Sequence, residues 1–378
     1  MNGDARDALA GRITAFEATG NAGVLLDDRG LVEVAILRAA MGWPASGPLP
    51  PGADIRRGLD AAVTAGTFLW LRSQVLPQAD RLDDLLEATD LLNAARKVAP
   101  RSIPRPVART LAAITGRARN PDYASLHDQA IDVLSAGTRS GELSAIDHAI
   151  VLLAAAASAA AGDRDEPYYL SDLGAAWVER FKVTGRDRDL ENGVTAHEQA
   201  LAAPMPAPGR APEEQAGLLA NYSAARLAQF EQGGDPRCLE RALVTARMAT
   251  DLARSAAEPP AAGAGAGRPV PSAGPGSGTA AGGDAGAGSP DRERAAAARL
   301  AQLASLSRLR AALLASYEQT GAESDLDEAV RVAQQAVSLA PAGDPEHPRY
   351  RASLTHLLSL QAERRARPGG ASSAADIA

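Results

Sequence analysis

One segment of the chain begins like the zinc-binding helix of a metalloprotease. Its sequence is His197-Glu198-Gln199-Ala200-Leu201. That chemistry needs a second His one helical turn after the first, so that both imidazoles hold the metal while the Glu acts as a base. Leu201 stands at that position, and the remaining histidines show no ligand spacing either (His127, His148, His347 and His356). We therefore expect no metal site and interpret His197 as an ordinary helix residue.

Cys238 is the only cysteine, so the chain can form no internal disulfide and no Cys-rich metal site. A nucleophilic thiol needs a neighbouring base or an electropositive setting. Arg237 and Arg241 are near, but no His is close in sequence. In the repeat described below, Cys238 aligns with Asp189 and Asp325. We interpret it as a replacement at a helix-capping position.

Phosphate-binding and acid/base motifs are also missing from the sequence. A P-loop requires Gly-Lys-Ser/Thr, but the only lysines, Lys97 and Lys182, follow Arg and Phe. Paired carboxylates such as Asp83-Asp84 stand at predicted helix starts, where acids interact favourably with the helix dipole. We expect no catalytic residues and no cofactor, and predict that the chain is not an enzyme.

Charge and hydropathy exclude two classes of partner. The net charge is −7 and the pI about 5.4, whereas a nucleic-acid-binding surface is normally basic. The longest apolar run, residues 149–162, is too short to span a bilayer, and the first residues do not form a secretory signal. We expect a soluble cytoplasmic protein that binds neither nucleic acid nor membrane.

A repeated pattern indicates the architecture. An aromatic residue stands four positions before a Gly, and a Leu follows five positions after it. Phe181, Phe230 and Tyr317 mark three copies, separated by 49 and 87 residues. The longer separation contains a Gly/Ala/Pro-rich tract at 256–292, and removing it restores the period. Fainter copies lie upstream, and a last one begins at Tyr350.

Each copy predicts a helix, a turn and a second helix. Gly can adopt the left-handed conformation that ends the first helix. Asp189 and Asp325 are placed to cap the second helix, and the following apolar residues share one helix face. Alanine is abundant, aromatics make up only 3% of the chain, and Pro clusters fall between the copies. We predict an all-α fold of roughly fourteen helices, arranged as an α-α superhelix of antiparallel pairs.

The predicted domain organisation follows from the repeats. We expect a divergent helical region at 1–120, repeats at 121–255, a flexible linker at 256–292, and further repeats at 293–378 with the last one incomplete. The linker is low in complexity and lacks the bulky apolar groups that a core needs. It is either a hinge between two blocks of repeats or a loop insertion, which costs little free energy because closure entropy grows slowly with length.

The repeats resemble the tetratricopeptide family (TPR). Leu173-Gly174-x-x-Trp177 is similar to the signature of that family's first helix, and Ala329, Ala333 and Pro341 are similar to the pattern of its second helix. The period of 44 to 49 residues departs from the family's 34. The sequence segments around Gly185 and Gly321 also resemble repeat arrays that precede the caspase-like peptidase (CHAT) domain in actinobacterial proteins.

These resemblances imply a scaffold and carry over no catalytic residue. By analogy, the first helices line a concave face that is small and apolar here, which suits an apolar helix or an extended segment. The alternative is that neighbouring helices simply cover these residues. Trp177 and Tyr222 recur at repeat positions and are expected in the core. The candidate partner contacts are Ala175, Val178, Ala224, Leu227, Ala311 and Leu314.

The predicted function is a non-catalytic protein-interaction scaffold for a protein or peptide partner. It would act as the sensor or regulatory arm of a larger system, such as a caspase-like peptidase. Partner binding would change the curvature of a stack whose units touch only their neighbours. Two alternatives remain: an all-helical enzyme with a dispersed active site, and a truncated fragment of a CHAT-domain protein.

Overall fold

The structure is a computed structural model, and it describes residues 2–41, 55–99, 101–105, 107–108, 123–204, 210–257 and 290–366. Within these ranges every regular element is a helix, and fourteen helices are present. Consecutive helices pack against one another, consistent with the predicted all-α superhelical arrangement. The chain divides into two compact units, Met1–Pro208 and Gly209–Ala378.

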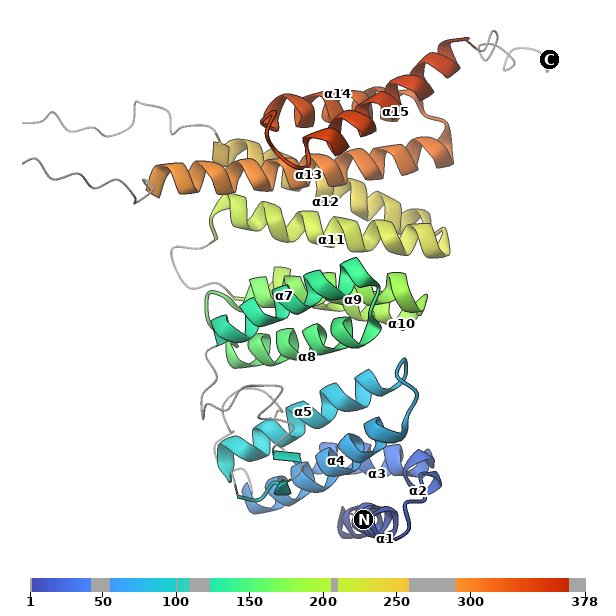
Figure 1. The fold of residues 1–378 in the computed structure, drawn as a ribbon, viewed down its shortest axis with the longest axis vertical. Coiled ribbons are helices and arrows are strands. Elements are labelled where there is room, and N and C mark those ends of the chain that lie inside the picture. Colours follow the sequence, from blue (N-terminus) through green and yellow to red (C-terminus); the bar gives the residue numbers. More distant parts are fainter. Residues whose placement is uncertain are drawn as a thin grey trace, which may run out of the picture. The chain divides into compact units, whose positions relative to one another are not determined.

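Unit 1 contains nine of the described helices (Figure 1). Helix α4 packs on α5, α7 on α8, α8 on α9, and α9 on α10, so neighbours in sequence are neighbours in space. Helix α1 packs on both α3 and α4. The bounds are α1 Asn2–Thr19, α2 Gly23–Leu26, α3 Arg29–Met41, α4 Ile55–Val75, α5 Arg81–Val98, α7 Tyr123–Ser140, α8 Leu143–Ala159, α9 Glu166–Thr184 and α10 Asp187–Ala202.

Unit 2 contains the five remaining described helices. Helix α13 packs on α11, α12 and α14, and α15 packs on α14. Figure 1 shows α13 running beside α12 and α14. The bounds are α11 Pro212–Gly233, α12 Pro236–Ala257, α13 Pro290–Thr320, α14 Glu323–Leu339 and α15 His347–Ala366.

The glycine turn forms as the sequence predicts. Gly20, Gly185, Gly234 and Gly321 all have φ between 66° and 70°, in the left-handed region. The N–H of each donates to the carbonyl of the aromatic residue four positions earlier, and all four N–O distances are 2.7 Å. Gly141 has the same left-handed φ. The aromatic-to-glycine spacing is thus one local hydrogen-bonded helix end, repeated along the chain.

The prediction that Asp189 and Asp325 cap the second helix is wrong. Helix α10 begins at Asp187 and α14 at Glu323, so each Asp is already the third helical residue. Neither helix has a side-chain cap. Both carboxylates instead accept hydrogen bonds from the preceding helix, because the turn brings the end of one helix beside the start of the next.

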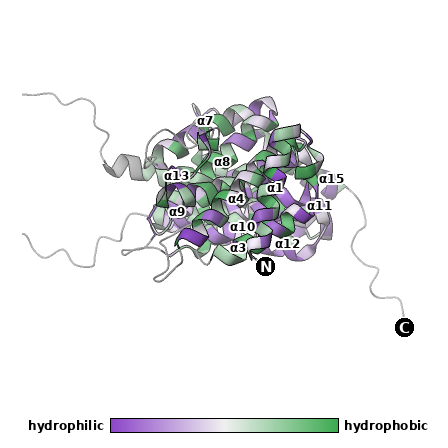
Figure 2. Ribbon diagram, turned by 90° about the horizontal axis from the view of Figure 1, so that it is seen from below, coloured by the Kyte–Doolittle hydropathy of each residue, from purple (hydrophilic) through white to green (hydrophobic). Residues whose placement is uncertain are grey.

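Each unit has its own apolar core. In unit 1 one cluster is centred on Phe68 and a second on Ile150 and Leu153, all fully buried. In unit 2 the largest cluster surrounds Leu313. Figure 2 shows hydrophobic and hydrophilic residues alternating along individual helices, which is the pattern of helices that bury one face. The expected burial of Trp177 and Tyr222 is confirmed, with 5% and 4% of each exposed.

The Gly/Ala/Pro-rich tract lies almost entirely outside the described residues. Helix α12 continues to Ala257 and α13 begins at Pro290, so the helices extend two or three residues into the predicted linker at each end. Helices α12 and α13, on either side of the tract, pack against each other within unit 2. This packing favours the interpretation of a loop insertion within one block of repeats.

No described helix combines the length and the apolar character needed to cross a bilayer.

Candidate functional site

A polar contact crosses the turn in each of the three strong repeats. It joins the residue five positions before the glycine to the residue four positions after it. In α9 and α10, Arg180 Nη1 donates to Asp189 Oδ1 at 2.5 Å. In α13 and α14, Ser316 Oγ donates to Asp325 Oδ2 at 2.6 Å. In α11 and α12, the Cys238 thiol lies 3.8 Å from Gln229 Oε1.

Cys238 takes part in the same contact across the turn as Asp189 and Asp325 do in their repeats. The residue is partly buried and is the third residue of α12, where it occupies the position of the two aspartates. The start of α12 is capped by Asp235, whose Oδ1 accepts the N–H of Arg237 at 3.0 Å. Cys238 is therefore part of the contact across the turn and is not a capping residue.

Arg180 makes this contact the centre of a buried charge network. Only 2% of Arg180 is exposed, and the two carboxylates that it binds are 2% and 3% exposed. Its Nε donates to Asp147 Oδ1 at 2.8 Å, and its Nη2 donates to the Ala79 carbonyl at 2.8 Å. The guanidinium also lies 5.7 Å from the ring centre of Trp177. One side chain thus joins α8, α9, α10 and the α4–α5 loop.

A second arginine reinforces the attachment of that loop. Arg186 Nη1 donates to the same Ala79 carbonyl at 2.6 Å and lies 2.7 Å from Asp80 Oδ1. Arg81 Nε lies 3.9 Å from Asp147 Oδ2. The loop between α4 and α5 is therefore held against the α9–α10 turn by two arginines that share one backbone acceptor.

The network has two buried carboxylates and one fully buried cation. Burial raises the pKa of Asp147, and Arg180 and Arg81 oppose that rise. Burial would lower the pKa of Arg180, but its bonds to Asp147 and Asp189 raise it. We interpret the network as structural, because every nitrogen of the Arg180 guanidinium already donates a hydrogen bond to another part of unit 1.

His127 is a histidine of unit 1 that lies close to two carboxylates. Its Nε2 lies 2.7 Å from Asp172 Oδ2 and its Nδ1 lies 3.7 Å from Asp128 Oδ1. The ring lies 4.7 Å, centre to centre, from that of Tyr169. A catalytic triad requires one ring nitrogen to face a nucleophile. Here both nitrogens face carboxylates, which favours a protonated imidazole linking α7 to α9.

His197 is buried against a glycine, as an ordinary helix residue would be. It is 1% exposed, and a Cβ placed on Gly174 would lie 2.7 Å from its ring atoms. Among the described residues, no group of three or more His, Cys, Asp or Glu side chains is arranged to hold a metal ion.

The six predicted partner contacts differ in burial. Leu227 is 8% exposed and packs with Leu239, Ala242 and Ala312, and Ala311 packs against the same cluster. Leu314 packs against the larger core of unit 2. Leu227 is therefore buried, and Ala311 and Leu314 are partly buried against these clusters.

The other three are placed as follows. Val178 lies against α10, since its Cγ2 would be 3.2 Å from a Cβ on Gly193. Ala175 and Ala224 are half-buried. Their role in partner binding stays a prediction.

Sequence reasoning missed the Arg180 network. A signal was present, because Asp147 interrupts the apolar run of α8 between Ile146 and Ala149. A carboxylate on an otherwise apolar helix face requires a buried partner. The sequence did not identify that partner, because Arg180 and the Ala79 carbonyl are distant along the chain and are brought together only by packing.

No known family model matches the sequence. No curated protein matches it either.

Proposed function

We propose that this chain is a non-catalytic, tetratricopeptide-like scaffold that binds a protein or peptide partner. The observation that supports the proposal is the repeated helix–glycine–helix unit, with the same hydrogen bond at each aromatic-to-glycine turn. Such units stack through contacts with their neighbours and offer extended surfaces for binding. The resemblance to repeat arrays beside caspase-like peptidase domains suggests a regulatory arm as the specific role.

The chemistry of the buried polar groups agrees with this proposal. The charged residues of the Arg180 network bind one another and a backbone carbonyl, and His127 is enclosed by carboxylates. These groups stabilise helix packing. They leave the surfaces of the repeats as the place where a partner would bind.

Affinity purification from a lysate of the source organism tests the proposal, with wild-type chain and two variants as bait. Ala224→Arg places a charge at a half-buried candidate contact, and Ala297→Arg places the same charge at an exposed position of α13. We expect a protein that is enriched by the wild type and by Ala297→Arg and is lost with Ala224→Arg. Circular dichroism of both variants checks that the helices persist.

The proposal fails if the wild-type chain enriches no protein, or if the enriched protein binds the Ala224→Arg variant equally well. The coding DNA around this chain tests the proposed regulatory role separately. A caspase-like peptidase domain encoded in the same or an adjacent gene would support that role, and its absence would leave only the general scaffold proposal.

A further inference from the structure

Helix α12 exposes two large apolar side chains near its middle. Val244 is 49% exposed and Met248 is 48% exposed. The two residues are four positions apart, so their side chains are neighbours on the surface of the helix. Covering such side chains with another apolar surface is favourable, because it removes them from water. The pair is therefore a candidate contact surface.

The fold of the repeat does not require apolar residues at these two positions. In α10 and α14 the positions that lie equally far from the turn glycine are all exposed and polar. They are Thr195 and Gln199 in α10, and Arg331 and Gln335 in α14. Only the repeat that contains α12 places Val244 and Met248 there, so packing within the repeat does not account for their apolar character.

The apolar pair belongs to a longer stripe of exposed residues. Steps of three and four residues lead from Arg241 through Val244, Met248 and Asp251 to Ser255, and all five are exposed. These steps match the a and d positions of a coiled coil, which form one narrow seam along a helix. The opposite face of α12 is buried in unit 2 and is rich in alanine. The seam therefore faces away from the core of unit 2.

The seam is complementary to itself when two copies of α12 run antiparallel. Val244 and Met248 lie two residues on either side of Ala246, and Arg241 and Asp251 lie five residues on either side. A two-fold axis at the level of Ala246 would place Val244 against Met248 of the second copy. The same axis would place Arg241 against Asp251. A parallel pair of helices would instead place each charge against its own copy, which is repulsive.

The charges that flank the seam agree with the antiparallel arrangement. Glu240 and Arg254 are exposed and lie beside opposite ends of the seam, so each would approach the other residue in the second copy. Arg247 would lie near its own copy, but its Nη2 already donates to Glu328 Oε2 at 2.8 Å. Arg254 now lies 3.5 Å from Asp251, as an exposed ion pair, which contributes little.

We propose that two copies of this chain associate through this surface, the α12 seam (residues 241, 244, 248, 251 and 255), as an antiparallel two-fold dimer. Each copy contributes one helix face, so the contact is small and the dimer should form only as the concentration rises. This inference does not rest on the proposed scaffold function, because the six candidate partner contacts lie on α9, α11 and α13.

Sedimentation velocity of the full-length chain over a series of concentrations tests the proposal. We expect the sedimentation coefficient to rise with concentration as monomers become dimers. Met248→Glu should weaken the dimer at least about tenfold, because it places a carboxylate against the apolar Val244 of the second copy. The matched control is Gln335→Glu, at the equivalent exposed position of α14, which should leave the dimer unchanged. Circular dichroism checks that both variants keep their helices.

A charge exchange tests the predicted pairing. Arg241→Asp places two carboxylates together at both ends of the seam and should weaken the dimer by about twofold to thirtyfold, the range expected for two exposed ion pairs. Asp251→Arg should have a similar effect. The double variant restores opposite charges and should recover most of the wild-type affinity, which a general loss of stability would not do.

Disulfide trapping tests the antiparallel orientation. The background is Cys238→Ser, which removes the only native thiol. A chain with Val244→Cys and a chain with Met248→Cys, one of them carrying a mass tag, are mixed and oxidised. We expect the disulfide between the two different chains to form faster than either disulfide between identical chains, because position 244 lies opposite position 248.

Four results would overturn the proposal. The wild-type chain could stay monomeric at every concentration, or Met248→Glu and Gln335→Glu could affect the dimer equally. The double charge variant could associate no more tightly than either single variant. Finally, disulfides between identical chains could predominate, which would show a parallel contact.

Discussion

Arg180 shows how one residue organises several segments of unit 1. It lies on α9 and binds Asp147 on α8, Asp189 on α10 and the carbonyl of Ala79 before α5. A buried ion pair contributes little net stability compared with apolar residues of the same shape, but removing one partner leaves a buried charge unpaired. The network is therefore a requirement for these helices to pack as they do.

Replacing Arg180 tests this requirement. Arg180→Met should lower the free energy of unfolding by about 3–5 kcal/mol, because two buried carboxylates lose their cation. Urea denaturation followed by circular dichroism measures the change. The control is Arg188→Met, which breaks the exposed pair with Asp83 and should cost less than about 1 kcal/mol. Equal effects of the two substitutions would contradict the network.

His127 should confer a pH dependence on unit 1. Its hydrogen bond to Asp172, opposed by burial, raises the pKa of the imidazole above its ordinary 6.5, with Asp128 adding to the rise. A raised pKa in the folded state means that the stabilisation is complete below about pH 6.5 and is lost as pH rises through the folded pKa.

The imidazole NMR titration of His127 measures this pKa directly. Asp172→Asn should lower it and reduce the slope of stability against pH above pH 6.5. Asp128→Asn should have a smaller effect, because Asp128 is 3.7 Å away and its side chain is 84% exposed. An unchanged titration in Asp172→Asn would show that the 2.7 Å contact does not determine the protonation of His127.

At the scale of the helix pair, the repeats differ in how they fill the same space. Gly174 and His197 pack against each other across α9 and α10. The corresponding positions, counted from the turn glycine, are Ser223 with Ala246 in the second strong repeat. Ser223 is buried and its Oγ donates to the carbonyl of Ala242 at 2.8 Å. The glycine on α9 thus makes room for the large His197, whereas the second repeat has two small residues at these positions.

A double-substitution experiment tests this complementarity. Gly174→Ala places a Cβ 2.7 Å from His197 ring atoms and should destabilise the chain by about 1–3 kcal/mol. In the His197→Ala background the same change should be neutral or stabilising, since the obstruction is gone. The control is Gly217→Ala in α11, where a Cβ meets nothing within 4 Å and helix propensity should add up to about 1 kcal/mol.

Thermal denaturation of the four chains (wild type, both singles and the double) supplies the coupling free energy between the two sites. Additive effects of Gly174→Ala and His197→Ala would contradict the close packing of α9 and α10.

At the scale of the whole molecule, the division into units does not coincide with the low-complexity tract. Unit 2 begins at Gly209, and α12 and α13 pack together although the tract separates them in sequence. Loop-closure entropy changes by only about 0.6 kcal/mol for each doubling of loop length. The tract should therefore be replaceable without loss of the fold of unit 2.

Shortening the tract tests this expectation. Deletion of residues 264–283, which lie outside the described residues, should change the free energy of unfolding by less than about 1 kcal/mol. Chemical denaturation of the shortened and full-length chains measures the difference. Deletion of an equal number of residues from α13 is the control and should unfold unit 2. A large loss of stability on shortening would show that the tract contributes contacts of its own.

The amino-acid sequence was sufficient to predict the helix–glycine–helix unit, because that unit depends on local interactions. Only glycine adopts the left-handed conformation at low cost, and the hydrogen bond at Gly185 or Gly321 joins residues four positions apart. The apolar spacing that follows each turn is a property of one helix. These features predicted the all-α class, the approximate number of helices and the burial of Trp177 and Tyr222.

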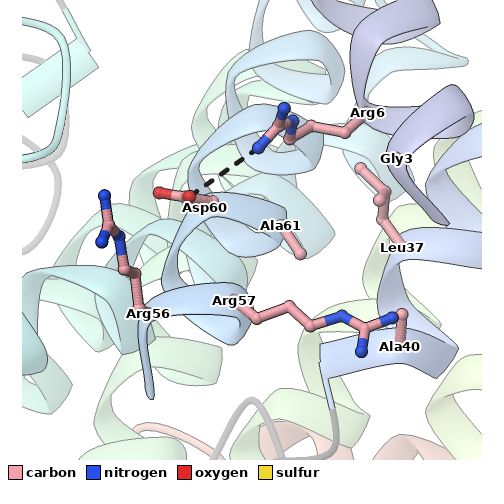
Figure 3. A pocket seen from close by; sticks show the side chains of 8 residues that line it. All are labelled: Gly3, Arg6, Leu37, Ala40, Arg56, Arg57, Asp60 and Ala61. Atoms are coloured by element: carbon pink, nitrogen blue, oxygen red, sulfur yellow. Dashed lines mark ion pairs between the residues drawn. The ribbon is translucent and has the colours of Figure 1, made fainter. Parts of the chain in front are cut away.

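Only the tertiary structure decided what the polar residues do. Asp189 is a plausible helix cap in sequence, yet it binds Arg180, because the packing of two helices determines which donor is nearest. Asp147 is bound by Arg180, 33 residues away in the chain, and Arg180 also donates to the carbonyl of Ala79, 101 residues away. The pocket that Figure 3 shows likewise combines residues of α1, α3 and α4. Local sequence determines where a helix begins and ends, but long-range packing determines which side chains meet.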